Sequence, residues 1–172
     1  WSEQNDMSIA RSQLNSSVGT QTAMFVGGGN YKPGSLGYTR YSEEYDGTSW
    51  SSGGSLVGTG RNGAFGFGSI NVGVITGGEA PGGSKPTTTE IYDSTSFSSS
   101  PASIANGRLS GTGAGTGSGL AGTTGIIQGG APGGNPTEEF NTSILAVTAG
   151  AWSSGANYPT DIQDAAGAGP TT

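Results

Sequence analysis

One motif of eight residues recurs along this chain and constrains its fold more than any other feature. It reads Glu-Glu-Tyr-Asp-Gly-Thr-Ser-Trp at 43–50, returns in altered form at 90–97 and appears shortened at 138–142. The first glutamates of the three copies are 47 and 48 residues apart. Self-similarity at a period of about 20 to 50 residues indicates a repeat architecture, in which each period is one structural unit.

Two other markers repeat with the motif. A short apolar run that ends in a glycine pair precedes each copy, and the pairs are Gly27-Gly28, Gly77-Gly78 and Gly129-Gly130. An arginine lies upstream of each run, and these are Arg11, Arg61 and Arg108. Three markers on a common period predict that residues 1–172 form a single repeat array. We place the units at approximately 1–49, 50–96 and 97–151, followed by a partial unit at 152–172.

Composition alone leaves the choice between folded and disordered chain open. Glycine occupies 35 positions and proline 8, a level at which an aperiodic chain would count as low-complexity. Charged residues make up only 10% of the chain, however, whereas disordered chains are usually rich in charge. The regular spacing of the markers decides the question in favour of a folded protein made of short strands and tight turns.

Each unit contains segments that can form four short strands. The first strands are expected within 12–21, 62–71 and 109–119, and the second strands, which should be buried, within 23–28, 73–78 and 125–130. The third are expected at 40–45, 87–92 and 137–140, and Trp50, Phe97 and Trp152 begin the fourth. Loops with proline and glycine separate the second strands from the third, because proline cannot donate to a sheet. Four short strands in a unit of about 50 residues are typical of a propeller blade.

The sequence resembles kelch-type repeats, which are marked by a glycine pair after an apolar strand, then a tyrosine, then a tryptophan. The residues that carry the resemblance are Gly27-Gly28, Tyr45 and Trp50, and again Gly77-Gly78, Tyr92 and Phe97. The variant at 43–50 is similar to kelch-like repeats in structural proteins of marine bacteriophages, including tail and fibre components. The resemblance implies an all-β fold of kelch-like β-propeller blades, each with four short antiparallel strands. The third unit departs from the pattern, with Phe140-Asn141 in place of Tyr-Asp.

The array is expected to hold about three blades and a partial one, fewer than the roughly 4 to 8 of a closed propeller. Trp1-Ser2 matches Trp50-Ser51 in register, and 169–172 fall where 19–22 lie in the first unit. We therefore expect either an open array or part of a larger ring, which more chain or other copies would complete.

The chain lacks the side chains that most kinds of enzyme catalysis require. The chain has no histidine and no cysteine, which removes the usual catalytic base and the usual zinc and copper ligands. Adjacent glutamates on a strand point to opposite faces and cannot flank one bond. Asp46 and Asp93 could hold calcium together with loop carbonyls, but nothing in their spacing is specific for it. We predict no enzyme activity and no catalytic, cofactor-binding or metal-binding residues.

Partners can be narrowed in the same way. A net charge of −6 with only six basic residues is unlike a nucleic-acid-binding surface, which needs clustered cations. No run of about 18 apolar residues exists, so membrane insertion by a helix is not expected. The segment 46–50 is similar to the Asp-box turn of sialidases, but aspartate and glycine are adjacent here, so the spacing fails. A glycoside-acting enzyme fragment remains a distant reading.

Three features allow both a structural and a functional interpretation. The recurring arginines and glutamates could form a ligand-binding ring, but repeated opposite charges favour partly buried ion pairs between neighbouring strands. Trp1, Trp50 and Trp152 could stack on sugars, but their equivalent positions favour packing between blades. The alternation of glycine from 111 to 119 leaves one strand face without side chains, which favours close packing against another strand over an adhesive loop.

The sequence thus predicts a non-enzymatic virion structural protein, a propeller-like module of a marine phage tail, fibre or appendage used for assembly or host-surface contact. The alternative is a secreted or cell-surface bacterial adhesin or glycan-binding module. The expected location is the virion, or else the secreted or cell-surface fraction. Expected partners are other structural subunits, as a homo-oligomer or larger assembly, and a cell-surface glycan. Functional contacts are expected in the loops near 30–38, 79–87 and 142–151.

Overall fold

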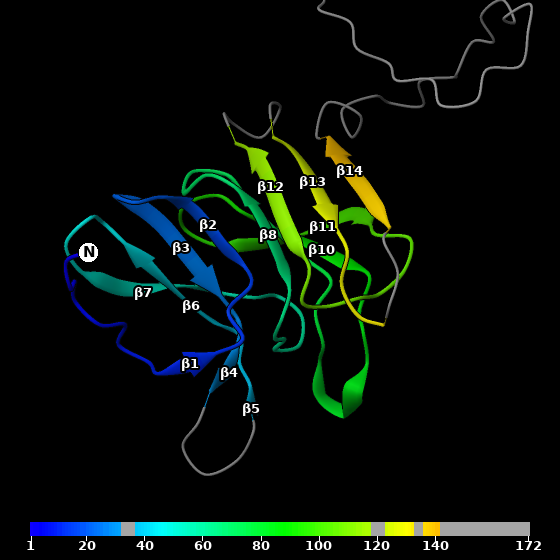
Figure 1. Cartoon of the computed structure of the whole chain (residues 1–172), viewed down its shortest axis with the longest axis horizontal. Coiled ribbons are helices and arrows are strands. Elements are labelled where there is room, and N and C mark those ends of the chain that lie inside the picture. The colour runs from blue at the N-terminus through cyan, green and yellow to red at the C-terminus, as the bar shows by residue number, and fades with distance from the viewer. Residues whose placement is uncertain (32–36, 118–122, 133–135, 142–172) are drawn as a thin grey trace, which may run out of the picture.

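The computed structural model describes residues 1–31, 37–117, 123–132 and 136–141, and these form an all-β structure (Figure 1). Helix is limited to one short 3-10 turn, η1 (Pro81–Gly83), within this part of the chain. None of its helices is long and apolar enough to cross a membrane.

Three antiparallel sheets follow one another along the chain. Each is built from strands that pair in the order in which they occur. Sheet I contains β2 (Ser17–Thr20), β3 (Ala23–Gly27), β6 (Tyr41–Tyr45) and β7 (Trp50–Ser55). Sheet II contains β8 (Phe65–Gly68), β9 (Gly73–Thr76), β10 (Thr88–Tyr92) and β11 (Phe97–Ser103). Sheet III contains β12 (Thr112–Thr116), β13 (Thr124–Gln128) and β14 (Thr137–Asn141).

A smaller sheet, not expected from the sequence, is formed by the segment before β2 and the loop between β3 and β6. It consists of β1 (Arg11–Ser12), β4 (Asn30–Tyr31) and β5 (Gly37–Tyr38), in the order β1-β4-β5. The β4 and β5 strands form a hairpin that projects at the lower edge of Figure 1, beside the loop that carries η1. Strands of two residues carry too little periodicity to be recognised in a sequence.

The expected four-strand order is confirmed in sheets I and II. The fourth strand of each begins at the expected aromatic residue, so β7 and β11 end sheets I and II instead of opening the next one. The sheet boundaries therefore fall after Ser55 and Ser103, not before Trp50 and Phe97 as the approximate units had them. The fourth strand expected at Trp152 and the partial unit at 152–172 lie outside the described residues.

The pairing register is the same in all three sheets, and it corrects the first glycine pair. Val26 pairs with Glu43, Ile75 with Glu90 and Ile127 with Glu138. Two consecutive glycines with positive φ follow each second strand: Gly28-Gly29, Gly77-Gly78 and Gly129-Gly130. In the first unit the sequence marker Gly27-Gly28 is thus one residue early, because Gly27 still belongs to β3. Only glycine adopts this left-handed backbone without strain.

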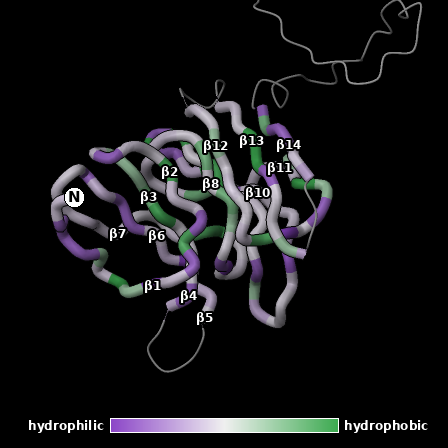
Figure 2. The backbone as a smooth tube through the Cα atoms, in the orientation of Figure 1, coloured by the Kyte–Doolittle hydropathy of each residue, from purple (hydrophilic) through white to green (hydrophobic). Residues whose placement is uncertain are grey.

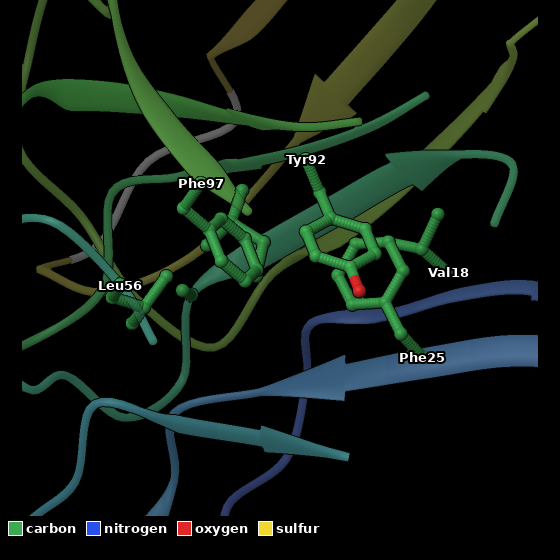
Figure 3. Close-up of a cluster of buried hydrophobic side chains, with 7 residues drawn as sticks. Val18, Phe25, Leu56, Tyr92 and Phe97 are labelled. Carbon is green, nitrogen blue, oxygen red and sulfur yellow. The ribbon is translucent and has the colours of Figure 1, made fainter. Parts of the chain in front are cut away.

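The core lies where sheets face one another. Figure 3 shows the cluster between sheets I and II, in which the Phe25 ring lies 4.7 Å from that of Tyr92 and 5.8 Å from that of Phe97. A second cluster fills the junction between sheets II and III, with Phe67 from β8 5.5 Å from Phe140 of β14. Figure 2 shows hydrophobic residues along β3, β8 and β13, and hydrophilic ones over the N-terminal segment.

The two junctions are filled from different strands. In sheet I the cross-strand pair is Val18 and Phe25, and in sheet II the equivalent pair is Phe67 and Val74. The phenylalanine ring of each pair packs directly against a glycine of the next sheet. Phe25 packs on Gly73, and Phe67 packs on Gly125. A Cβ on either glycine would collide with the ring, so the glycine provides the space.

The glycine face of β12 packs against β8, as the alternation predicted. A Cβ on Gly113 would lie 2.5 Å from the carbonyl oxygen of Gly66, closer than side-chain carbons approach a backbone. Gly66 in turn lies against the backbone of Ser16, just before β2. The first strands of the three sheets therefore lie side by side (Figure 1), and the packing interpretation is confirmed for 111–117; Gly119 is outside the described residues.

Candidate functional site

The recurring arginine and glutamate of each unit form an ion pair. Arg11 Nη2 lies 2.8 Å from Glu43 Oε1, and Arg61 Nη2 lies 2.6 Å from Glu90 Oε1. Arg108 pairs with Glu138 in the same way. The arginine precedes the first strand and the glutamate sits in the third strand of the same sheet, so the pair ties the connector to the sheet that follows it.

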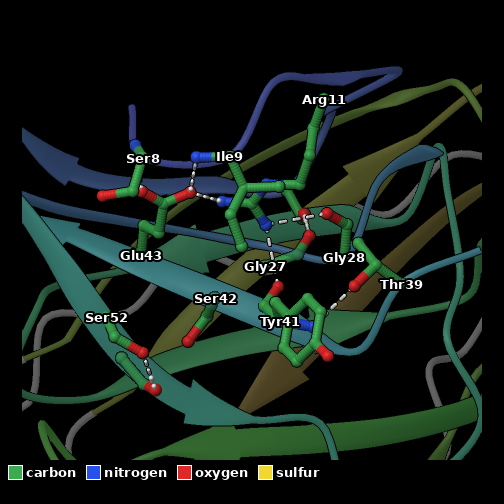
Figure 4. Close-up of polar contacts among 12 residues, drawn as sticks. Ser8, Ile9, Arg11, Gly27, Gly28, Thr39, Tyr41, Ser42, Glu43 and Ser52 are labelled. Atoms are coloured by element: carbon green, nitrogen blue, oxygen red, sulfur yellow. Dashed lines mark hydrogen bonds and ion pairs between the residues drawn. The ribbon is translucent and has the colours of Figure 1, made fainter. Parts of the chain in front are cut away.

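Backbone groups bind the members of each pair, as Figure 4 shows for Arg11 and Glu43. The Glu43 carboxylate accepts hydrogen bonds from the amides of Ser8 and Ile9, at 2.7 and 3.3 Å. Glu90 accepts from Val57 and Gly58 at 2.6 and 3.3 Å. Arg11 Nη1 donates to the carbonyls of Gly28 and Tyr41 at 3.0 and 2.8 Å. These bonds fix the segment that enters each sheet and the glycine corner after its second strand.

The pairs are sealed from solvent to different degrees. The side chains of Arg61 and Glu90 are 2% and 3% exposed, whereas that of Glu138 is 25% exposed. Burial lowers the pKa of the Arg61 guanidinium, and Glu90 opposes this by stabilising the charged form. Burial raises the pKa of Glu138, but the Ala105 amide and Arg108 outweigh it, and the pKa is lowered.

These charges are therefore structural, as the sequence favoured, but each pair joins the segment before the first strand to the third strand, and not two neighbouring strands of one sheet. Their carboxylate oxygens and at least one nitrogen of each guanidinium bind backbone groups or one another, while Arg11 Nε, Arg61 Nε and Arg108 Nη2 are buried without a hydrogen-bond partner. In the described units these charges do not form an open ring. Asp46 and Asp93 are also used locally. Each accepts hydrogen bonds from the amides two and three residues later, in the turn before the fourth strand, and these bonds lower the pKa of both carboxyls.

The tryptophans do not behave alike. Trp50 packs on Tyr45 of its own sheet, with ring centroids 5.1 Å apart, which is a contact within one sheet and not the predicted contact between blades. Trp1 is fully exposed, so the packing prediction is wrong for it. Trp152 lies outside the described residues.

The most distinctive open surface is a groove of about 570 Å³ beside the β4–β5 hairpin. Its walls carry three tyrosines and an arginine: Tyr31, Tyr38, Tyr41 and Arg40. Tyr31 and Tyr41 are 37% and 52% exposed. Arg40 Nε donates to the carbonyl oxygen of Leu56 at 2.7 Å, which holds the arginine against the connector to sheet II. Aromatic faces with a polar edge and a positioned cation suit a ligand that is both apolar and polar, such as a sugar.

Two of the loops singled out by the sequence contact each other through Tyr38, which also lines this groove. Tyr38 in the first loop donates its hydroxyl hydrogen to Glu79 Oε1 in the second at 2.7 Å. This hydrogen bond, followed by burial and the charge of Glu79, raises the pKa of Tyr38. Lys85 Nζ lies 3.8 Å from Glu79 Oε2. The sequence singled out the loops but not these side chains, because the contact joins residues 41 positions apart. The third loop, 142–151, lies outside the described residues.

The described residues contain no group of three or more acidic, histidine or cysteine side chains that could hold a metal ion. The adjacent glutamates are separated as expected: Glu43 binds the connector, whereas Glu44 accepts a hydrogen bond from the Tyr92 hydroxyl of sheet II.

The comparisons with known proteins bear on the fold. No protein-family model matches the sequence, and no curated protein matches it. The solved structure of YjhT is similar to this chain with a TM-score of 0.60 and 18% sequence identity. The fold is the point of similarity. The match covers 78% of this chain and 43% of that one, so the chain spans less than half of the YjhT chain.

Proposed function

We propose that this chain is a non-enzymatic structural module made of kelch-like propeller units, belonging to a marine phage tail, fibre or appendage and used for assembly or host-surface contact. The observation that supports it best is the structural use of the recurring charges. The three arginine–glutamate pairs are the most regular polar feature of the sequence, and all three hold connectors to sheets. This structural use of the repeated charges supports a scaffold role.

Two further observations support the propeller reading. Sheets I and II each have four antiparallel strands in chain order, the strand arrangement of a propeller blade. Their first strands lie side by side with that of sheet III, as inner strands do around a common axis. The virion assignment rests on the resemblance of 43–50 to repeats in phage structural proteins.

Fractionation of the source culture tests this function. Antiserum raised against residues 1–172 should detect the protein in virus-sized particles purified on a density gradient. Detection only in cell-envelope or secreted fractions free of particles would overturn the virion assignment and favour the alternative.

The tyrosine groove favours a second candidate, a secreted or cell-surface adhesin that binds glycans. Tyr31 and Tyr41 offer exposed rings in a groove that also holds Arg40. A glycan array screened with the purified chain should show binding that Tyr41→Ala weakens. Val57→Ala is the control, because Val57 is similarly exposed, at 48%, and does not line the groove. Absence of binding to any glycan on the array would remove this candidate.

A further inference from the structure

The outward face of sheet III is exposed at positions that are buried in the other two sheets. Phe25 of β3 and Val74 of β9 are fully buried by the sheet that follows each of them. Ile126 occupies the equivalent position in β13 and is 37% exposed. Its cross-strand partner Ala114 is exposed as well. An exposed isoleucine in register with positions that are buried in the other two sheets indicates a face that another element can cover.

Side-chain size suggests what covers it. At the two closed junctions, a pair that contains phenylalanine seats on Gly73 or Gly125. On sheet III the pair is the smaller Ala114 and Ile126. In sheet I, the position of these glycines is occupied by Met24. The strand register shows the equivalence, because Met24 pairs with Tyr45 as Gly73 pairs with Tyr92. A small pair facing a large, flexible methionine fills the same space as a phenylalanine pair facing glycine.

Polar groups at the two ends match in the same register. The Tyr92 hydroxyl of sheet II donates to Glu44 of sheet I. Glu139 occupies the position of Glu44 on sheet III and is exposed, and Tyr45 occupies the position of Tyr92. Tyr45 is covered on this side by the N-terminal segment, whose Gln4 Oε1 accepts from the Tyr45 hydroxyl at 3.3 Å and is itself exposed.

Backbone hydrogen bonds between units repeat as well. The amide of Gly29 donates to the carbonyl of Arg61, and that of Gly78 to the carbonyl of Arg108, both at 2.8 Å. The next donor in this series is the amide of Gly130, and the acceptor with the same position in the first unit is the carbonyl of Arg11. Strong hydrogen-bonding groups in register favour one docking geometry over others.

We propose that a second copy of this chain docks head to tail, with its Met24–Tyr45 face on the Ala114–Ile126 face of the first copy. The N-terminal segment then moves off Tyr45, which is only 8% exposed beneath it, and the Tyr45 hydroxyl donates to Glu139 of the other copy. The carbonyl oxygen of Arg11 accepts from the amide of Gly130 of that copy. The two faces differ, so the contact is heterologous and makes a ring if the rotation closes or a filament if it does not. The inference rests on the proposed function and deepens it, because it names the partner in assembly.

Sedimentation velocity over a concentration series tests the contact. The wild-type chain, of 16.9 kDa, should associate into dimers or longer species. Ile126→Asp and Met24→Asp should each raise the dissociation constant by at least about tenfold, because each buries a charge in the contact. Val57→Asp is the matched control: it introduces the same charge at a similarly exposed residue in the connector between sheets I and II, away from both faces. It should leave association unchanged.

A mixing experiment keeps the test independent of folding defects. Ile126→Asp retains an intact Met24 face, and Met24→Asp retains an intact Ile126 face. An equimolar mixture should therefore form a 1:1 complex that neither variant forms alone. A wild-type chain that stays monomeric, equal effects of Val57→Asp, or a mixture that stays monomeric would each overturn the proposal. Particle fractionation gives a separate answer, since a chain that associates in this way but never sediments with particles contradicts only the proposed function.

Discussion

The junction between sheets I and II and the junction between sheets II and III share a backbone arrangement but not a packing solution. In the first, the ring comes from β3, and in the second it comes from β8. The cross-strand pair is Val18 with Phe25 in one sheet and Phe67 with Val74 in the next. The two sheets therefore share the same strand register and the same pair of residue types. The phenylalanine lies on the second strand in sheet I and on the first strand in sheet II.

The ion pairs offer the largest test of this comparison. Glu90→Gln should destabilise the protein by about 3 to 5 kcal/mol, because it leaves the Arg61 charge buried without its carboxylate. Glu138→Gln should have a clearly smaller effect, since Glu138 is 25% exposed and water already screens its attraction to Arg108, so less interaction energy is lost. Urea unfolding measures both, with the exposed Glu3→Gln as control. Equal losses of unfolding free energy in the two variants would contradict the idea that solvent exposure of the glutamate weakens the second ion pair.

Exchanging the ring between strands tests the packing. Phe67→Val leaves a cavity and Val74→Phe overpacks the junction, so each alone should cost about 1 to 3 kcal/mol. The double variant recreates the pattern of sheet I, and should lose less than the sum of the two single variants by about 0.5 to 3 kcal/mol. The reverse exchange at Val18 and Phe25 is the matched experiment in sheet I. Additive losses at both pairs would show that the rings are not interchangeable.

The turns before the fourth strands give a smaller contrast. Gly47 has φ +95° in the first turn, whereas Ser94 holds the equivalent left-handed conformation in the second, with φ +73°. Glycine adopts this conformation without strain, so Ser94→Gly should stabilise the protein and Gly47→Ser should destabilise it, each by about 0.5 to 1 kcal/mol. Thermal unfolding followed by circular dichroism measures the two shifts. Shifts of the same sign would contradict equivalent turns.

The smallest expected effect is on the pH dependence of stability. The pKa values of Asp46, Asp93 and Glu138 are lowered in the fold, so the unfolded chain takes up protons first as the pH falls. Their stabilisation is complete above the ordinary carboxyl pKa of about 4 and is lost as the pH falls through the lower folded values. Asp93→Asn should reduce this loss of stability in acid. Urea midpoints measured between about pH 6 and about pH 2, a range that brackets the carboxyl pKa values, test this. An unchanged slope would indicate that the turn does not hold the carboxylate.

Burial raises the pKa of Glu44, so its contribution has the opposite sign: it is present at low pH and is lost as the pH rises through the folded value. Glu44→Gln should therefore make stability slightly less dependent on pH in that range. A double variant with Asp93→Asn should show the two changes adding, since the two side chains belong to different sheets and accept hydrogen bonds from different residues.

The sequence by itself determined the period, the strand order and the structural use of its charges. Arg61 and Glu90 could be paired from spacing alone, because a repeated charge of each sign in each unit needs a repeated partner. The glycine alternation at 111–117 likewise predicted a close approach, since a strand face without side chains can pack only against something near.

Tertiary structure decided what depends on contacts between units. The contacts of Phe25 with Gly73 and of Phe67 with Gly125 connect neighbouring sheets. No local sequence pattern shows which strand of a pair carries the phenylalanine. The tyrosine groove exists because the short β4–β5 hairpin brings Tyr31 and Tyr38 beside Tyr41, a pairing that a two-residue strand cannot signal. The exposure of Ile126 follows from its place at the last sheet of the described chain, because its residue type alone would have placed it in the core.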